Sequence, residues 1–156
     1  MPEDEVELTL EQSATHLLEE CRMVLPGIQA LFGFQLIAVF SERFACVLRA
    51  SEQLMHLGAI LCVVLAIALV MAPAAIQRLR EPRQVSRRFV DVCSRLLMWS
   101  MVPLAVATTV EVYLVGRVVA QRVDISIGAA AVTIATFVAC WILLPTRLRI
   151  PRSFPT

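Results

Sequence analysis

The chain has 156 residues, of which 58% are hydrophobic and only 17% are charged. Its length allows one domain, and this composition, with a mean hydropathy of +0.75, excludes an ordinary soluble domain because much of the apolar surface would find no core. The formal net charge of +1 hides an acidic N-terminus and a basic middle, so it indicates nothing about partners. We expect a membrane protein in contact with membrane lipids and without a nucleic-acid partner.

The N-terminal segment is acidic, and residues 1–8 are predicted to form a disordered tail. A helix is predicted to begin near Thr9, where Thr9-Leu10-Glu11-Gln12 fits a capping box. Apolar residues then recur with helical spacing, at Leu10, Ala14, Leu17, Leu18, Cys21 and Leu25. This pattern predicts an N-terminal amphipathic helix that lies at the membrane surface and continues into a first span.

Four apolar runs follow, with predicted spans at residues 23–41, 54–73, 96–116 and 125–145. Each is long enough to cross a bilayer, since about 20 helical residues cover a hydrocarbon core of ~30 Å. Pro26 predicts a kink early in the first span, and Pro73 marks the predicted end of the second. The third helix is predicted to begin near Ser86, before the membrane. We therefore predict an all-α fold, a transmembrane four-helix bundle made of two hairpins, as a single domain over residues 9–145.

A basic loop at residues 77–95 separates the two predicted hairpins, and a short tail at residues 146–156 follows the last span. With four spans, this loop and both termini share one side, which carries most of the arginines. The positive-inside rule then predicts that the loop and both termini are cytoplasmic. The loop also supplies candidate contacts for anionic lipid headgroups at Arg78, Arg80, Arg83, Arg87 and Arg88. Determination of topology explains these arginines equally well.

Glu111 is the one acid inside a predicted span. It lies roughly 22 Å along the third span by helical rise, in the outer third of the bilayer. A carboxylate at that depth costs a few kcal/mol and normally faces the bundle interior with a partner. We predict a polar cluster of Glu111 with His56 and Gln35, which lie at similar depth, and consider Arg117 a weaker partner. The cluster could relay a proton or a cation, or it could be a structural hydrogen bond, and the second interpretation is favoured.

The passage from Glu19 to Phe44 resembles the opening of a family of small, uncharacterised four-span bacterial membrane proteins. The matching positions include Leu31-Phe32, Phe34, the exit Phe40-Ser41-Glu42-Arg43-Phe44 and the first-span motif Glu20, Arg22, Pro26, Gly27 and Gln29, with a second match at Ala72-Pro73-Ala74-Ala75. The resemblance implies the bacterial inner membrane and no established activity, although family members are sometimes labelled as ion antiporters. Arg22 is expected to turn inward, toward a glutamate or toward the central loop.

The sequence contains no glycine-rich phosphate loop, no HExxH or GxSxG motif and no paired carboxylates on one helix face. We therefore expect no enzyme activity and no cofactor. The five cysteines have neither CxxC spacing nor an accompanying histidine pair, so we expect neither a disulfide nor a metal site. The favoured function is a structural or accessory role through helix packing and lipid contacts, with the protein partner unknown. The alternative is a proton-coupled small transporter or antiporter that acts as a homodimer.

Overall fold

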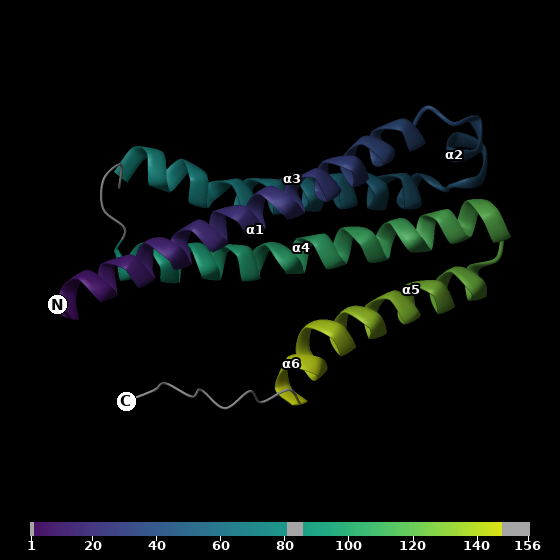
Figure 1. Ribbon diagram of the computed structural model, residues 1–156. Coiled ribbons are helices and arrows are strands. Elements are labelled where there is room, and N and C mark those ends of the chain that lie inside the picture. The colour runs from purple at the N-terminus through teal and green to yellow at the C-terminus, as the bar shows by residue number, and fades with distance from the viewer. Residues whose placement is uncertain (1, 81–85, 148–156) are drawn as a thin grey trace.

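The computed structural model describes residues 2–80 and 86–147, with side chains described from Leu10 onward except at residue 80. These residues are helical, without a strand (Figure 1): α1 (Pro2–Ala38), α2 (Glu42–Val47), α3 (Ala50–Arg80), α4 (Arg87–Ala120), α5 (Val123–Val138), the π-helical turn η1 (Ala139–Leu143) and α6 (Leu144–Arg147). Four helical stretches are long and apolar enough to cross a membrane: Leu10–Ala38, Ala50–Leu79, Arg87–Ala120 and Val123–Arg147. The predicted all-α, four-span architecture is confirmed.

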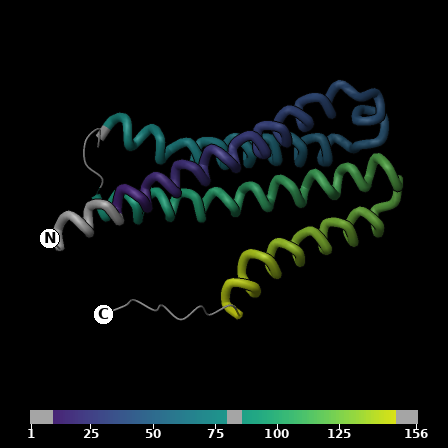
Figure 2. Tube along the Cα trace, viewed as in Figure 1, coloured from purple at the N-terminus to yellow at the C-terminus, as the bar shows by residue number. Residues whose placement is uncertain are grey.

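The four long stretches form two consecutive hairpins (Figures 1 and 2). The first joins α1 to α3 through the short helix α2, and the second joins α4 to α5 through a tight turn at Gln121, whose φ of 53° is left-handed. Both connections lie at the same end of the molecule, and the N-terminus lies at the other end, with the junction between α3 and α4. We call the end with α2 and the α4–α5 turn the hairpin end.

The N-terminal amphipathic segment is part of one continuous helix, α1, which begins at Pro2 and therefore includes residues predicted as a tail. Its apolar face does not lie free for a membrane surface. Ala14 packs with Phe89 and Cys93 of α4, and the neighbouring Leu17 and Ile76 join this contact. Protein thus covers the face that the sequence pattern assigned to lipid.

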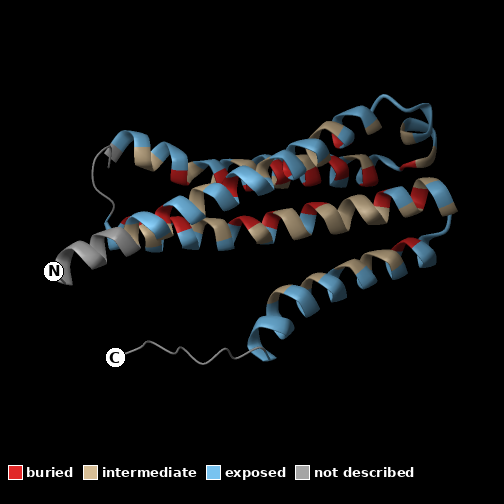
Figure 3. Ribbon diagram, viewed as in Figure 1, coloured by how far each residue is buried: buried red, intermediate tan, exposed pale blue. Residues whose placement is uncertain are grey.

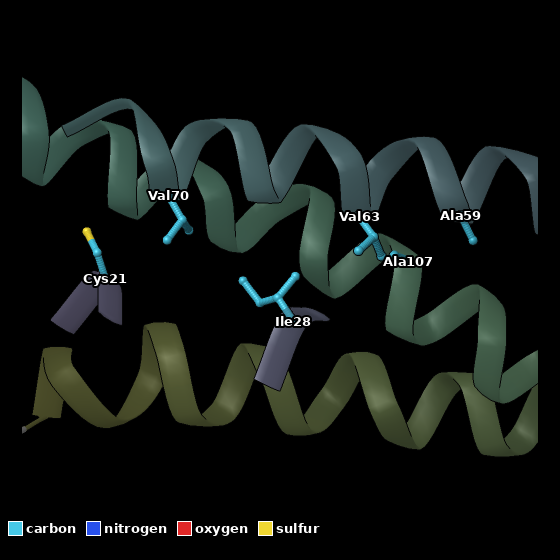
Figure 4. Close-up of a cluster of buried hydrophobic side chains, with 6 residues drawn as sticks. All are labelled: Cys21, Ile28, Ala59, Val63, Val70 and Ala107. Carbon is cyan, nitrogen blue, oxygen red and sulfur yellow. The ribbon is translucent and has the colours of Figure 1, made fainter. Parts of the chain in front are cut away.

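The core lies where α1, α3 and α4 meet. Small and β-branched side chains of the three helices point toward one another there (Figure 4): Cys21, Ile28, Ala59, Val63, Val70 and Ala107. Small residues let helix backbones approach closely, which matters in a membrane because lipid tails are as apolar as the side chains. The contact between α3 and α4 is the most extensive between any two helices, so this pair forms the frame of the bundle.

Among the long helices, α5 packs mainly against α4, and most of its residues are exposed (Figure 3). One close approach fixes the α4–α5 hairpin, because a Cβ atom added at Gly116 would lie 3.0 Å from Ser126 Oγ and 3.1 Å from Ser126 Cα. Ser126 is fully buried and donates a hydrogen bond to the Arg122 carbonyl oxygen at 2.8 Å. Because Gly116 has no side chain, Ser126 of α5 can pack directly against α4 at this position.

The ends of the helices depart from the predicted limits in places. Helix α3 continues past Pro73 to Arg80, so proline does not end it. Membrane helices tolerate proline where neighbouring groups satisfy the freed carbonyl. Helix α4 begins as predicted, with Ser86 as its N-cap accepting a hydrogen bond from the Phe89 amide at 3.2 Å. The predicted basic loop is therefore shorter than expected, since its residues 77–80 belong to α3 and its residues 87–95 belong to α4.

Residues 81–85, and residues 148–156 of the predicted tail, lie outside the described residues.

Candidate functional site

Three polar side chains predicted to lie together do meet at the hairpin end of the bundle. Gln35 near the end of α1, His56 on α3 and Glu111 on α4 form what we call the Glu111 cluster. Glu111 Oε1 accepts a hydrogen bond from Gln35 Nε2 at 3.1 Å and lies 2.9 Å from His56 Nδ1. The side chains of His56 and Glu111 are only 3% and 14% exposed. A carboxylate and an imidazole are thus held in contact away from the surface.

The backbone of α1 fixes the orientation of His56. Its Nε2 lies 3.0 Å from the carbonyl oxygen of Gln35, which belongs to the last turn of α1. Since a carbonyl oxygen only accepts, Nε2 carries a proton and donates it. The rings of Phe44 and His56 also pack edge to face, with centroids 4.9 Å apart. With Nε2 on the Gln35 carbonyl, the ring of His56 presents Nδ1 to Glu111.

At 2.9 Å, the contact between His56 Nδ1 and Glu111 Oε1 is short enough for a proton to lie between the two atoms. If both Nδ1 and Glu111 lacked a proton, two lone pairs would face each other at 2.9 Å inside a poorly hydrated site. With the proton on Nδ1 the pair is ionic, and with the proton on the carboxyl group it is neutral. The contact is close without forming an aligned hydrogen bond at Nδ1, and the buried Gln35 Oε1 has no hydrogen-bond partner in the described part of the chain. The cluster is therefore incompletely bonded.

A cavity of about 140 Å³ borders the cluster. Glu111 and His56 form part of its wall, together with Ser41 and Phe44 from the α1–α3 connection and aliphatic residues near the end of α4. It lies at the hairpin end, where α4 stops at Ala120. The carboxylate is therefore reachable from outside the bundle, whereas Gln35 is buried behind it.

A second charged cluster lies nearby and was not predicted. Glu52 Oε1 accepts hydrogen bonds from Arg117 Nε at 2.6 Å and from the Tyr113 hydroxyl at 3.2 Å, and Glu52 Oε2 accepts from the Arg49 amide at 2.9 Å. Glu52 and Arg117 are both buried. We call Glu52, Tyr113 and Arg117 the Glu52 cluster. It joins α3 to α4, and both carboxylate oxygens are satisfied.

Sequence reasoning missed this cluster because Glu52 lies just outside the predicted span at residues 54–73 and Arg117 was weighed only against Glu111. The available signal was spacing. Glu52 precedes His56 by one helical turn on α3, and Arg117 follows Glu111 by less than two turns on α4. Two antiparallel helices that bring His56 to Glu111 therefore also bring Glu52 near Arg117.

The first-span motif takes no part in either cluster. Glu20, Arg22, Pro26, Gly27 and Gln29 are all exposed on α1. Of the two directions expected for Arg22, the structure places it on the side of the predicted central loop. Arg22 lines a groove of about 150 Å³ between α1 and α3, together with Gln77 and Arg78, the first residues of that predicted loop. The buried face of α1 is instead formed by Cys21, Ile28 and Gln35.

Three of the remaining candidate residues, Arg78, Arg87 and Arg88, are exposed at the opposite end of the bundle from the Glu111 cluster. The side chain of Arg80 and the whole of Arg83 lie outside the described residues. Within the described ranges, no group of three or more histidines, cysteines or acids is placed to hold a metal ion.

Comparison with known proteins identifies a family whose function is unknown. A family model described as "Family of unknown function (DUF6328)" matches residues 4–145. The chain belongs to this family. The match covers all four membrane-spanning stretches of this DUF6328 member and both of its charged clusters. No curated protein and no solved structure matches the chain. We therefore infer the function of this multi-pass membrane protein from its own residues.

Proposed function

We propose that this chain is a proton-coupled small transporter that acts as a homodimer, and that the Glu111–His56 pair is its proton site. The observation that carries the proposal is the 2.9 Å contact between a carboxylate and an imidazole in the wall of a cavity, within helices that are apolar enough to cross a membrane. Ionisable groups inside membrane spans are costly and are a feature of proton pathways. No enzyme activity is part of this proposal.

The chemistry of the pair suits reversible proton binding. The net charge of the Glu111–His56 pair is zero when it holds the shared proton and −1 when that proton leaves. A negative charge would then remain on Glu111, stabilised only by Gln35 Nε2. Such a state is unfavourable in a poorly hydrated site unless a cation replaces the proton. Loss of the proton is therefore coupled to binding of another positive charge, as exchange requires.

A second copy completes the proposed path, because the cavity lies at the hairpin end of the bundle and does not by itself cross the chain. Helix α5 packs mainly on α4, which leaves a wide apolar surface for another chain or for lipid. The exposed amide of Gln29 on α1 would be unsatisfied against lipid tails, whereas a second copy could hydrogen-bond to it. A path across the membrane would then run between two chains.

The proposed location is the bacterial inner membrane, with both termini in the cytoplasm. Support comes from the arginines, of which Arg78, Arg87 and Arg88 are exposed at the end opposite the hairpin end. The cavity beside Glu111 would then open toward the outer side.

Proteoliposomes test the proton site. The purified chain is reconstituted with a pH-sensitive dye inside, and proton movement is recorded after a pH jump. We expect Glu111→Gln to abolish protein-dependent proton movement, because glutamine keeps the shape and hydrogen bonding but cannot exchange a proton. Glu42→Gln is the matched control, because Glu42 is an exposed acid of α2 that does not line the cavity. Equal proton movement by the wild type and Glu111→Gln would refute the proposal.

A second candidate function is a structural or accessory role through helix packing and contacts with anionic lipids. The groove lined by Arg22, Gln77 and Arg78 favours it, because two guanidinium groups line one groove that also has apolar walls. Flotation with vesicles does not suit an integral protein, so we would measure phospholipids retained through detergent purification. Retention of anionic lipid that Arg22→Gln/Arg78→Gln abolishes, combined with no proton movement by the wild type, would favour this role.

A further inference from the structure

The cavity beside Glu111 has the chemical character of a binding site for a small organic cation. Its polar wall consists of the Glu111 carboxylate, the His56 imidazole and the Ser41 hydroxyl, and the aromatic ring of Phe44 stands beside them. The rest of the wall is aliphatic and includes Val115 and Val118 of α4. Glu111 is the single acid in this wall, so the site attracts positive charge, while the aliphatic side favours a hydrocarbon body.

The size of the cavity limits the ligand. At about 140 Å³ it is far larger than the ~10–15 Å³ that one water requires, and it is smaller than the ~300 Å³ at which drug-sized pockets begin. It therefore suits a molecule of a few heavy atoms.

The donor set disfavours an inorganic cation. Hard cations such as Na⁺, Mg²⁺ and Ca²⁺ are bound by several oxygens at once, typically six or more for Ca²⁺. Here Glu111 and Ser41 are the side chains that bring oxygen to the cavity wall. An ammonium head needs only a carboxylate and one or two further acceptors, and the wall also contains the aromatic side chain of Phe44, a residue type that attracts cations.

We propose that this cavity binds a small aliphatic primary ammonium ion, with its charged head on Glu111 and its hydrocarbon body against Val115 and Val118. The inference rests on the proposed function and names the cation that exchanges with the proton. Both contacts from the cluster reach Glu111 through Oε1, so the second carboxylate oxygen is left to receive a ligand from the cavity.

Binding of the ammonium ion releases the proton of the Glu111–His56 pair. The incoming ion brings one positive charge next to Glu111, and the proton on His56 Nδ1 leaves to water at the open end of the cavity. The net charge of the site stays at zero before and after the exchange. Nearby charged groups do not change this balance, since Glu52 and Arg117 form a neutral pair and Glu42 and Arg43 on α2 are exposed.

Proton release on binding provides the experiment. The purified chain in detergent, in nearly unbuffered solution with a pH indicator, is titrated with n-propylammonium chloride. We expect saturable acidification, with a proton released for each ammonium bound. Sodium chloride tests for an inorganic cation, and 1-propanol tests for the hydrocarbon body alone. Saturable acidification by sodium at the same concentrations would overturn the assignment to an ammonium ion.

Val118→Phe fills the cavity without removing a charged group. We expect it to raise the half-saturating propylammonium concentration at least about tenfold, which corresponds to ~1.4 kcal/mol. Val132→Phe on the exposed surface of α5 is the matched control and should leave the titration unchanged. Equal half-saturation in Val118→Phe and the wild type would overturn the proposed location.

The two proposals fail separately. A direct acid–base titration that differs between the wild type and Glu111→Gln, with no acidification by propylammonium, would overturn the ammonium site and leave the proton site standing. Identical acid–base titrations of the wild type and Glu111→Gln would overturn the proton site. A retained elution volume and helical circular dichroism establish that each variant is folded.

Discussion

The close approach of α4 and α5 makes Gly116 the glycine whose replacement should be most harmful. In Gly116→Ala the new Cβ atom would lie 3.0–3.2 Å from Ser126 Oγ, Cα and Cβ. Two of these three atoms cannot turn away by a change of the Ser126 rotamer, so α5 has to move. Overpacking of this kind costs about 1–3 kcal/mol. Helix propensity opposes this cost, because alanine is favoured over glycine inside a helix by about 1 kcal/mol.

Gly58→Ala is the matched control, since Gly58 also lies inside a long helix but has no atom within 4 Å of the added Cβ. The two variants share the same gain in helix propensity. The difference between their free energies of unfolding therefore reports the overpacking alone, and we expect Gly116→Ala to be less stable than Gly58→Ala by about 1–3 kcal/mol.

Reversible unfolding by sodium dodecyl sulfate in mixed micelles, followed by circular dichroism, measures this difference. Adding Ser126→Ala to Gly116→Ala should restore only part of the loss, because it removes Oγ and leaves Cα and Cβ in place. Equal stabilities of Gly116→Ala and Gly58→Ala would refute the close packing of α4 on α5.

Three further predictions concern the Glu52 cluster and the topology. Tyr113→Phe removes one hydrogen bond to Glu52 and should lower the free energy of unfolding by about 1.5–3 kcal/mol, measured in the same micelles, whereas a loss near zero would contradict the 3.2 Å contact. Cys46 is exposed at the hairpin end and should react with a membrane-impermeant thiol reagent in intact cells. A cysteine introduced by Arg88→Cys in a Cys46→Ser background should not react, and the reverse labelling pattern would mean that the topology is inverted. Replacing Arg78, Arg87 and Arg88 together by glutamine should weaken the orientation bias in this labelling assay, and an unchanged pattern would assign orientation to other residues.

The sequence predicted the four helices because apolar runs of spanning length leave few alternatives in a membrane protein. It also predicted that the third helix begins near Ser86, and the structure shows Ser86 as the N-cap of α4. The predicted end at Pro73 was wrong because proline ends isolated helices more reliably than packed ones.

The Glu111 cluster could be predicted from the depth of its residues in the bilayer. A buried carboxylate needs a partner, and His56 and Gln35 are the polar residues predicted at a similar depth. The orientation of α1 could not be predicted in the same way. Pro26, Gln29 and Gly33 share a helical face, and either this face or the one with Cys21 and Ile28 could have packed inward. The structure selects the second, because Ile28 and Cys21 fill the space between α3 and α4 and Gln35 on the same side reaches Glu111.

The two charged clusters share α3 and α4, and they differ in how completely their carboxylates are bonded. Glu52 uses both oxygens and has three donors, whereas Glu111 receives its contacts on Oε1 only. A fully bonded pair resists change, and an incompletely bonded one can gain or lose a partner at lower cost. The Glu52 cluster therefore holds α3 against α4, and it would keep this frame fixed during the proton exchange that we propose for the Glu111 cluster.

Arg117→Met tests whether the fixed pair positions the labile one. It leaves Glu52 buried with only Tyr113 and the Arg49 amide as donors, so α3 and α4 should separate at the hairpin end and lengthen the His56–Glu111 contact. We expect less proton uptake per chain in an acid–base titration, even at temperatures where circular dichroism shows a folded bundle. Glu52→Gln/Arg117→Met removes both charges together and should recover much of that uptake, because no unpaired charge remains to force the helices apart. Unchanged uptake in Arg117→Met would mean that the two clusters act independently, and that α1 alone, through the Gln35 carbonyl and amide, sets the geometry of the proton site.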